Sequence, residues 1–570
     1  MKYSIKYIVF TIILFGLLNL NTNVFNKNAS VVKTNDISYV KDIWNPLISD
    51  SVNEKKIILV VDGLEVDVDK QDMFMDENLN IMISYKKLKQ NFDCAVNLYD
   101  NDRLVFEKYN TKIELEINSN TAYINNAEIE LDSEPFICDS EIYVPLELVA
   151  REFDYDYQWD IAANKISALN NSLDNPIVPY SYDLRDVARN SKVKNQGSFG
   201  TCWAFASLTA IESSLLPEEE LELAPDHMSL QNSFSSSQND GGEYTMAAAY
   251  LTSWQGPVYE KDDPYGDGVS NPNLTAVKHV QEVQILPEKN YEKIKEAVYK
   301  YGGVQSSLYL SLTSPTSKSV YYNRKNYAYC YKGEERPNHD IVIIGWDDNY
   351  PKENFNMVLE QNGAFICQNS WGESFGDDGV FYVSYYDVNI GIHNVVYSLI
   401  EDTNNYDNIY QSDLCGWVGQ LGYGRESVYF ANAYTANTKE EVSAAGFYAT
   451  GENTDYEMYY ISNFENIESL DVNNRKLIKK GKFENAGFYT VKFDTPKLVA
   501  EGEKFAIMIY INTPNSVHPA AIEYHAEEST KNVDLSDGEG YISNRGKKWD
   551  SVEETQSCNL CLKVYTKNVP

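Results

Sequence analysis

Positive charge and histidine are both scarce in this sequence. The 570 residues carry 48 Lys and Arg against 84 Asp and Glu, which gives a formal net charge of −36. Nucleic acids and anionic membrane surfaces repel such a protein, so neither is expected as a partner. The six histidines leave few candidates for a general base that works near neutral pH.

Long apolar runs are missing after the N-terminal region. Lys2 and Lys6 precede an apolar stretch at residues 8–18, which is typical of a signal-type leader and short for a membrane span. Residues 1–28 are predicted to be a signal peptide or an anchor, since no small-residue cleavage site stands out after the apolar stretch. We therefore expect a secreted or cell-envelope protein.

Cysteine pairs with metal-site spacing are nearly absent. Of eight cysteines, only Cys558 and Cys561 form a Cys-x-x-Cys pair, in an alternating stretch at 558–565 that predicts a strand. On a strand their Cα atoms lie about 10 Å apart, beyond the roughly 7 Å that a disulfide spans. No second pair completes a zinc site, and no calcium-loop spacing is present. No cofactor or metal is expected, with calcium left as an alternative.

Polar linkers divide the rest of the chain into three blocks. Residues 56–169 have short alternating strands and one short helix that begins after Pro145. Residues 177–402 mix helical and strand patterns. Residues 406–567 are rich in aromatic and β-branched residues with Gly and Asn turns, which predicts an all-β sandwich. The expected fold class is multidomain α+β.

The segment Gln-Gly-Ser-Phe-Gly-Thr-Cys-Trp-Ala-Phe-Ala at 196–206 places a cysteine at the start of an apolar-periodic helix. Thr201 is the expected N-cap. The positive end of the helix dipole favours the thiolate of Cys202, which is the nucleophilic form. Alone, the cysteine would sooner be a small buried apolar residue than a nucleophile, so the assignment depends on a base elsewhere in the chain.

His339 is the predicted base, because it alone among the histidines begins a strong apolar strand, at 340–346. A base needs an orienting partner on its far ring nitrogen. Asn369 ends another strand, at 363–368, and its side-chain oxygen can accept the imidazole proton. Trp371 is placed to shield that hydrogen bond from water, which strengthens it.

These motifs, in this order, resemble the papain family of cysteine peptidases. The resemblance covers the whole second block and includes Asn-Ser-Trp-Gly at 369–372. His339 follows Cys202 by 137 residues (339 − 202), within the roughly 130–150 typical of that family. Residues 179–185 look like the mature N-terminus of its fold. The resemblance implies a helical lobe and a β lobe.

The resemblance also implies a catalytic role for each matched residue. Cys202 attacks the peptide carbonyl. His339 takes the thiol proton, which creates an ion pair, and later protonates the leaving amine. Asn369 fixes the imidazole. Gln196 and the Cys202 backbone N–H offer hydrogen bonds to the developing oxyanion, and one such donor is typically worth about 3 kcal/mol.

Substrate contacts are implied as well. Gly241 and Gly242 look like the glycine pair whose backbone holds the substrate chain. Trp371 is also predicted to contact the substrate. Glu243 falls near the pocket for the second residue before the scissile bond, where a carboxylate favours a basic side chain. The alternative is a glutamate exposed on the rim.

Two positions depart from the family pattern. Phe199 stands where many members have a disulfide-forming cysteine, and Asp340 follows His339 where a small residue is usual. The Asp340 carboxylate is expected to face solvent; turned inward, it would raise the pKa of His339. The long interval between His339 and Asn369 predicts an inserted loop near residues 349–361. These departures place the chain near the bacterial, surface-associated branch of the family.

The flanking blocks carry resemblances of their own. The first is similar to copper-amine-oxidase N-terminal-like modules, but it contains no histidine, so no copper site is expected. It is interpreted as structural, targeting or prodomain material. In bacterial relatives the domain after such a peptidase is lectin-like, so the third block is expected to bind cell-surface glycan or to pack on the peptidase.

The sequence thus predicts an exported cysteine endopeptidase that acts on a protein or peptide substrate. Two alternatives remain open: an envelope- or glycan-binding adhesin whose peptidase domain is vestigial, and a cell-wall amidase with the same Cys-His chemistry. A zymogen held inactive by the N-terminal block is a further hypothesis.

Overall fold

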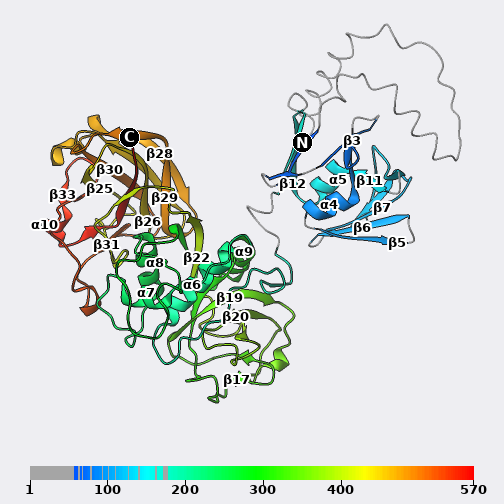
Figure 1. Ribbon diagram of the computed structural model, residues 1–570, viewed down its shortest axis with the longest axis horizontal. Coiled ribbons are helices and arrows are strands. Elements are labelled where there is room, and N and C mark those ends of the chain that lie inside the picture. Colours follow the sequence, from blue (N-terminus) through cyan, green and yellow to red (C-terminus); the bar gives the residue numbers. More distant parts are fainter. Residues whose placement is uncertain are drawn as a thin grey trace, which may run out of the picture. The chain divides into compact units, whose positions relative to one another are not determined.

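The computed structural model describes residues 57–569, apart from gaps at 62–63, 67, 77–79, 93, 100–101, 109–110, 126, 139–140, 161–163 and 171–177. The predicted leader at 1–28 lies outside the described residues. The chain forms two compact units, which divide between residues 171 and 172 (Figure 1). No helix in the described part of the chain is both long enough and apolar enough to cross a membrane.

Over its described residues, the N-terminal unit packs three small sheets and two short helices around one apolar core. Pro145 precedes α5 (Leu146–Glu152), as the sequence predicts. Ser84 caps α4 (Tyr85–Asn91) by accepting a hydrogen bond from the N–H of Lys86. The strands are β1 (Ile58–Val61), β2 (Leu64–Val66), β3 (Met73–Met75), β4 (Ile81–Ser84), β5 (Ala95–Tyr99), β6 (Arg103–Lys108), β7 (Thr111–Glu116), β8 (Thr121–Ile124), β9 (Ala127–Glu130), β10 (Phe136–Cys138), β11 (Glu141–Pro145), β12 (Tyr155–Asp160) and β13 (Lys165–Asn170).

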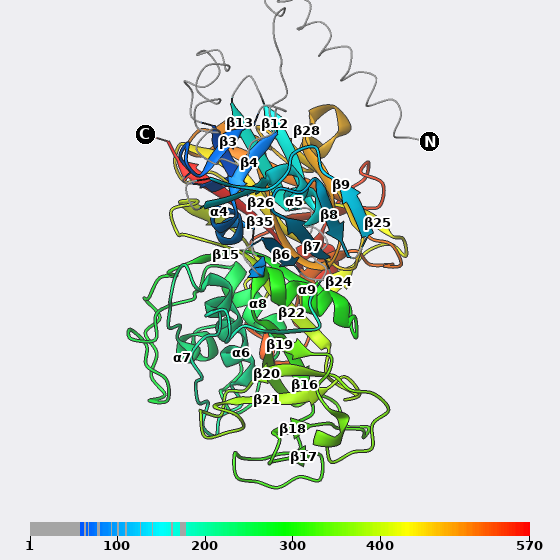
Figure 2. The same cartoon turned by 90° about the vertical axis from the view of Figure 1, so that its right-hand side faces the viewer.

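The second unit begins with a helical lobe beside a β lobe (Figures 1 and 2). The helix α6 (Cys202–Leu215) is buried on nearly every side, since it packs against strands and other helices. The other helices are α7 (Pro225–Leu230), α8 (Tyr244–Thr252), α9 (Tyr291–Tyr301) and the 3-10 turn η3 (Lys352–Asn354). The strands are β14 (Ser181–Asp183), β15 (His279–Leu286), β16 (Val304–Leu308), β17 (Tyr322–Asn323), β18 (Ala328–Tyr329), β19 (His339–Asp347), β20 (Ala364–Gln368), β21 (Val380–Ser384) and β22 (Ile392–Glu401).

Residues 408–568 form a β-sandwich, which confirms the predicted fold class. Its main core lies between two layers of strands. One layer is the sheet with the order β28-β27-β30-β25-β32-β33, and the other is the part of the large sheet with the order β29-β26-β35-β23. The elements are β23 (Asn408–Tyr410), β24 (Gly419–Leu421), β25 (Ser427–Thr435), β26 (Glu440–Ala449), β27 (Thr454–Ile461), η4 (Ile467–Leu470), η5 (Val472–Asn474), β28 (Lys476–Phe483), β29 (Ala486–Val499), β30 (Lys504–Asn512), β31 (Ala520–Glu523), η6 (Glu528–Thr530), β32 (Gly540–Ser543), β33 (Asp550–Ser551), α10 (Val552–Gln556), β34 (Asn559–Leu560) and β35 (Leu562–Asn568).

One sheet joins the two parts of the second unit. Its thirteen strands include the order β19-β16-β22-β15-β29-β26, so β15 of the first part pairs directly with β29 of the sandwich. Gly487 lies opposite Gln284 in this pairing. A Cβ at Gly487 would lie 2.0 Å from the Val283 carbonyl oxygen, and its φ is +141°. Glycine is therefore required for the two parts to approach so closely.

The strand predicted at 558–565 is interrupted. It divides into β34 and β35 at Cys561, whose N–H donates to the Ala521 carbonyl oxygen over 3.0 Å. The prediction of one continuous strand is wrong because the two halves pair with different strands: β34 with β31, and β35 with β26 and β23. Cys558 and Cys561 are both buried and free.

Candidate active site

Cys202 is the first residue of α6, and Thr201 occupies the N-cap position. The Thr201 side chain makes no capping bond; its hydroxyl pairs with that of Tyr265 at 2.7 Å. The predicted N-cap position of Thr201 is therefore confirmed, although its side chain does not make the capping bond. The backbone N–H groups of Cys202, Trp203 and Asp340 lie where they favour the Cys202 thiolate.

His339 is the first residue of β19, and its Nε2 lies 2.8 Å from Oδ1 of Asn369. That oxygen also accepts a hydrogen bond from the N–H of Ser370 at 2.8 Å. This second bond orients the Asn369 amide with its oxygen toward the ring, so Nε2 of the neutral imidazole is the donor. Nδ1 then carries a lone pair that can accept a proton.

The strand pairing explains why these two residues meet. The strands β19 and β20 run antiparallel, with Val342 opposite Gln368. His339 precedes that pair by three residues and Asn369 follows it by one, so both lie at the same end of the ladder. Both side chains are buried, at 8% and 2% exposure. The ring of Trp371 lies 5.4 Å from the imidazole, as expected of a group that shields it.

Burial sets the resting charges of the cysteine and the histidine. The Cys202 side chain is partly exposed, yet its surroundings are dense enough that burial raises the pKa of the thiol to about 12, with a further contribution from the Asp340 carboxylate. Burial lowers the pKa of His339 to about 4. Each group alone is therefore neutral at pH 7. A thiolate–imidazolium pair requires proton transfer that creates both charges together, because each charge then offsets the burial cost of the other.

The Gln196 side chain is held at both ends of its amide by hydrogen bonds. Its Oε1 accepts a hydrogen bond from Oγ of Ser370 at 2.6 Å, and its Nε2 donates to the carbonyl oxygen of Phe199 at 2.8 Å. One N–H of the amide remains for another acceptor. The hydroxyl of Tyr265 donates to the Gln196 carbonyl oxygen at 2.9 Å.

Two of these positioning residues were missed in the sequence. Ser370 lies inside the Asn-Ser-Trp-Gly motif, so its position was visible but its partner was not. Tyr265 carries no sequence signal, because it is one of 44 tyrosines.

The glycine pair lies against the start of α6. A Cβ at Gly242 would lie 2.4 Å from Nε1 of Trp203, and a Cβ at Gly200 would lie 3.0 Å from the Cα of Gly241. The backbone of Gly241 and Gly242 is therefore packed against Gly200 and the Trp203 side chain, on either side of Cys202 in the sequence. Glu243 follows at the N-cap position of α8, where its side chain is exposed and makes no capping bond.

Asp340 does not face solvent. It is 8% exposed; its Oδ1 accepts a hydrogen bond from Oγ of Ser307 at 2.6 Å, and its Oδ2 accepts one from Nε2 of Gln305 at 2.9 Å. The expectation is wrong because β16 pairs with β19 in a register that sets Ser307 opposite Asp340. The inward carboxylate also does not raise the pKa of His339, which is lowered by burial.

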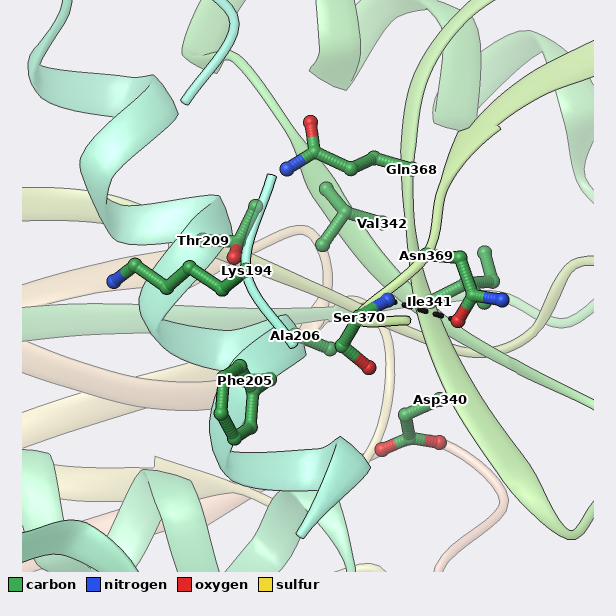
Figure 3. A pocket seen from close by; sticks show the side chains of 10 residues that line it. All are labelled: Lys194, Phe205, Ala206, Thr209, Asp340, Ile341, Val342, Gln368, Asn369 and Ser370. Atoms are coloured by element: carbon green, nitrogen blue, oxygen red, sulfur yellow. Dashed lines mark hydrogen bonds between the residues drawn. The ribbon is translucent and has the colours of Figure 1, made fainter. Parts of the chain in front are cut away.

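Figure 3 shows Ser370 between Ala206 of α6 and Asn369, and the Asp340 carboxylate turned toward α6. These residues line a narrow cavity of about 10 Å³ beside the site. Within the part of the chain that the structure describes, no three His, Cys, Asp or Glu side chains gather as ligands for a metal ion.

Comparison with known families assigns this region. The profile of the papain family cysteine protease matches residues 178–400, a range that contains the site just described.

Residues 178–400 form a papain-like domain.

The two other parts of the chain also match family profiles. Residues 409–566 match the lectin like domain, and residues 53–168 match the copper amine oxidase N-terminal domain. The chain therefore combines a papain-family domain with the two flanking modules that the sequence resembled.

Curated relatives match the papain-family domain. Cathepsin K of Mus musculus is 30% identical over 211 residues, which cover 35% of this chain and 58% of that protein. Pro-cathepsin H of Mus musculus is 29% identical over 215 residues, 36% of this chain and 60% of that protein. The chain thus spans about three fifths of the length of these curated relatives.

Solved structures extend the likeness beyond the papain-family domain. The clostridial cysteine protease Cwp84 after propeptide cleavage has a TM-score of 0.60 and 26% identity, and the match covers 68% of this chain and 99% of that one. The cysteine protease and lectin-like domains of Cwp84, a surface layer associated protein of Clostridium difficile, give 0.59 and 25%, covering 69% and 89%.

Proposed function

We propose that this protein is an exported cysteine endopeptidase that hydrolyses peptide bonds with Cys202 as nucleophile, His339 as acid and base, and Asn369 as the orienting residue. The observation that carries the proposal is the 2.8 Å contact between His339 Nε2 and Asn369 Oδ1. It leaves Nδ1 as the proton acceptor, while Cys202 stands at the N-terminus of α6 and close to the Asp340 backbone N–H.

The chemistry follows in two halves. The sulfur of Cys202 attacks the substrate carbonyl carbon as its proton moves to His339 Nδ1. The tetrahedral intermediate collapses when His339 returns that proton to the leaving amine, which leaves a thioester on Cys202. Water then attacks the thioester with His339 as base, and the acid product departs as the thiol is restored. No cofactor takes part in this scheme.

Gln196 is proposed to stabilise the oxyanion. One N–H of its side-chain amide donates to the Phe199 carbonyl oxygen, and the other N–H is the proposed first donor to the oxyanion. The Cys202 backbone N–H is the proposed second donor. Because the Ser370 hydroxyl fixes the far side of the Gln196 amide, the donor is in place before the reaction. Such preorganisation is what lowers the barrier.

Hydrolysis of casein and of fluorogenic peptides tests this proposal. The wild type is expected to be active and to lose activity after thiol alkylation, and Cys202→Ala is expected to be inactive. The matched control is Cys138→Ala, which replaces a partly exposed cysteine of the N-terminal unit. This variant is expected to remain active. Activity in Cys202→Ala contradicts the proposal. Absence of peptide hydrolysis with glycan binding retained favours the adhesin alternative, and release of wall peptides alone favours the amidase.

Export to the cell envelope is part of the same proposal. The basic and apolar start of the chain supports it, and so does the likeness to a surface layer associated protein. The match to the lectin like domain supports glycan binding by residues 409–566. Binding of purified cell-wall glycan by an inactive Cys202→Ala protein, competed by soluble fragments of the same glycan, is the expected result.

We also propose that the N-terminal unit restrains the enzyme as a prosegment. It is a compact unit of its own, and a polar stretch joins it to the papain-family domain. Cwp84, which this chain resembles in structure, undergoes propeptide cleavage. Active-site titration of full-length and trimmed protein is expected to find more competent thiol after cleavage near residues 170–179. Equal titres contradict the restraint.

A further inference from the structure

A cavity of about 650 Å³ lies where the helical lobe meets the segment that leads into the sandwich. Its volume is typical of small-molecule pockets, roughly 300–1,000 Å³. Its walls come from α7, the turn after α8, the loop before β15 and the segment 403–407. The helix α8 lies at the end of the helical lobe next to the sandwich (Figures 1 and 2). None of the lining residues belongs to the candidate active site, so the proposed peptidase chemistry makes no use of this cavity.

Aromatic rings line part of the cavity and are held in place by stacking. The ring centroids of Trp254 and His279 are 3.6 Å apart, with 5° between the ring planes. Tyr406, the third lining ring, stacks on Tyr565 of β35, which stacks on Trp254 at 5.3 Å. Trp254 has a φ of +61°, a conformation that is rare for a bulky residue and that occurs preferentially at ligand sites. The aromatic part of the lining is therefore formed without a ligand.

Three buried polar atoms of the lining have no hydrogen-bond partner of regular geometry within the described part of the chain. They are Nε1 of Trp254, Oε1 of Gln255 and Nε2 of His227. The Asn271 backbone favours the protonated form of His227, but burial is the larger effect and lowers the pKa of this ring. Burial likewise lowers the pKa of His279, so both rings are uncharged at pH 7. Buried polar atoms without partners are uncommon in folded proteins, and each is a candidate contact for a bound molecule.

Other polar groups of the lining are accessible and can accept hydrogen bonds. Asp407 is exposed and Gln231 is half-buried. Within the described residues, Oδ2 of Asp407 accepts the N–H of Asn568 at 2.8 Å, and Gln231 donates through its Nε2. Oδ1 of Asp407 and Oε1 of Gln231 are thus left as acceptors. The exposed hydroxyls of Thr275 and Thr403 border the same cavity.

The lining is rich in acceptors and poor in positive charge. No Lys or Arg is among the described residues that line the cavity, and the Asp407 carboxylate repels anions. An anionic glycan is therefore a poor fit. A neutral sugar offers several hydroxyl donors on each ring, whereas an extended peptide offers one backbone N–H for each residue. Aromatic rings also provide an apolar surface for the C–H groups of a sugar ring.

We propose that this cavity binds a neutral saccharide. The inference goes beyond the proposed function, because it does not depend on peptide hydrolysis and because the lining residues all lie outside residues 409–566. A glycan bound here would contact both the helical lobe and the segment that leads into the sandwich.

Calorimetry with the full-length Cys202→Ala protein, which lacks the proposed nucleophile, tests the inference. The probes are neutral trisaccharides of glucose, galactose, mannose and N-acetylglucosamine, compared with a galacturonic acid trisaccharide and with trialanine. Saturable binding of at least one neutral trisaccharide is expected, and the galacturonic acid trisaccharide is expected not to bind. Failure of every neutral trisaccharide to bind overturns the proposal, and so does binding of only the anionic trisaccharide or only the peptide.

Variants then assign the bound trisaccharide to the cavity. Gln231→Ala and Asp407→Ala each remove an acceptor and are expected to weaken binding about fivefold or more. The matched controls, Gln420→Ala in β24 and Asp455→Ala in β27, replace exposed residues outside the cavity and should keep the affinity. Unchanged affinity in both cavity variants overturns the proposal and leaves glycan binding by residues 409–566 as a separate question. Melting temperatures verify folding, and either cavity variant decides if the other does not fold.

Discussion

Ser370 Oγ donates a hydrogen bond of 2.6 Å to Oε1 of Gln196, across 174 residues of sequence. The Gln196 N–H donates in turn to the Ser370 carbonyl oxygen over 2.8 Å. These two bonds join the loop before α6 to the loop after β20. They set the distance between the proposed oxyanion donor and the histidine–asparagine pair.

We predict that Ser370→Ala lowers kcat by about five- to tenfold with KM little changed, because one hydrogen bond worth roughly 1 kcal/mol no longer orients the Gln196 amide. Gln196→Ala, which removes the donor itself, is expected to cost about 10²- to 10³-fold. Steady-state kinetics with one neutral peptide measure both. Ser370→Thr keeps the hydroxyl and should restore most of the rate; failure of that rescue would assign Ser370 to packing alone.

A second prediction concerns the charge beside the nucleophile. Burial is the first cause of the raised pKa of Cys202, and the Asp340 carboxylate is the second. Asp340→Asn removes a negative charge that disfavours the thiolate, so the pKa of Cys202 should fall. The pH profile of alkylation by iodoacetamide is then expected to shift to lower pH. Glu373→Gln, which removes an exposed carboxylate two residues after Trp371, provides the unshifted reference profile. A shift of the Asp340→Asn profile toward higher pH would contradict this account.

The close packing of Gly242 predicts a steric effect on the site. In Gly242→Ala the new Cβ would lie 2.4 Å from Trp203 Nε1. We expect a loss of about 1–3 kcal/mol in the free energy of unfolding and reduced peptide hydrolysis. Gly268→Ala is the control, since its Cβ meets no atom within 4 Å and only the positive φ of +70° opposes it. Thermal denaturation of both variants gives the comparison; equal losses would argue against the Trp203 contact.

Removal of the lectin-like domain is predicted to destabilise the papain-family domain. Its core includes Tyr448, Phe488, Ala521 and Cys561 from the sandwich, and β15 loses its partner β29. Each large apolar side chain contributes about 1.5–3 kcal/mol by burial, so a protein that ends at residue 408 should be largely insoluble or melt at a lower temperature. Deletion of residues 1–171 is the control and leaves the melting of the second unit unchanged, because that segment belongs to a separate compact unit.

The sequence alone determined the fold class and the family, because both are recorded in local patterns. The helix start at Cys202, the strand start at His339 and the strand end before Asn369 can each be read within a few residues. The alternation and turn residues after residue 406 were sufficient to predict a sandwich.

The tertiary structure decided which side chains meet across long sequence distances. Strand register turns Asp340 inward beside Ser307, and no local pattern specifies the pairing of β16 with β19. In the same way, the Thr201 hydroxyl bonds to Tyr265, which is 64 residues away, and not to an N–H of its own helix. The helix dipole favours the Cys202 thiolate, whereas burial favours the uncharged forms of Cys202 and His339. The segment 196–206 predicts which thiol is the nucleophile, while the packing around it decides when that thiol can ionise.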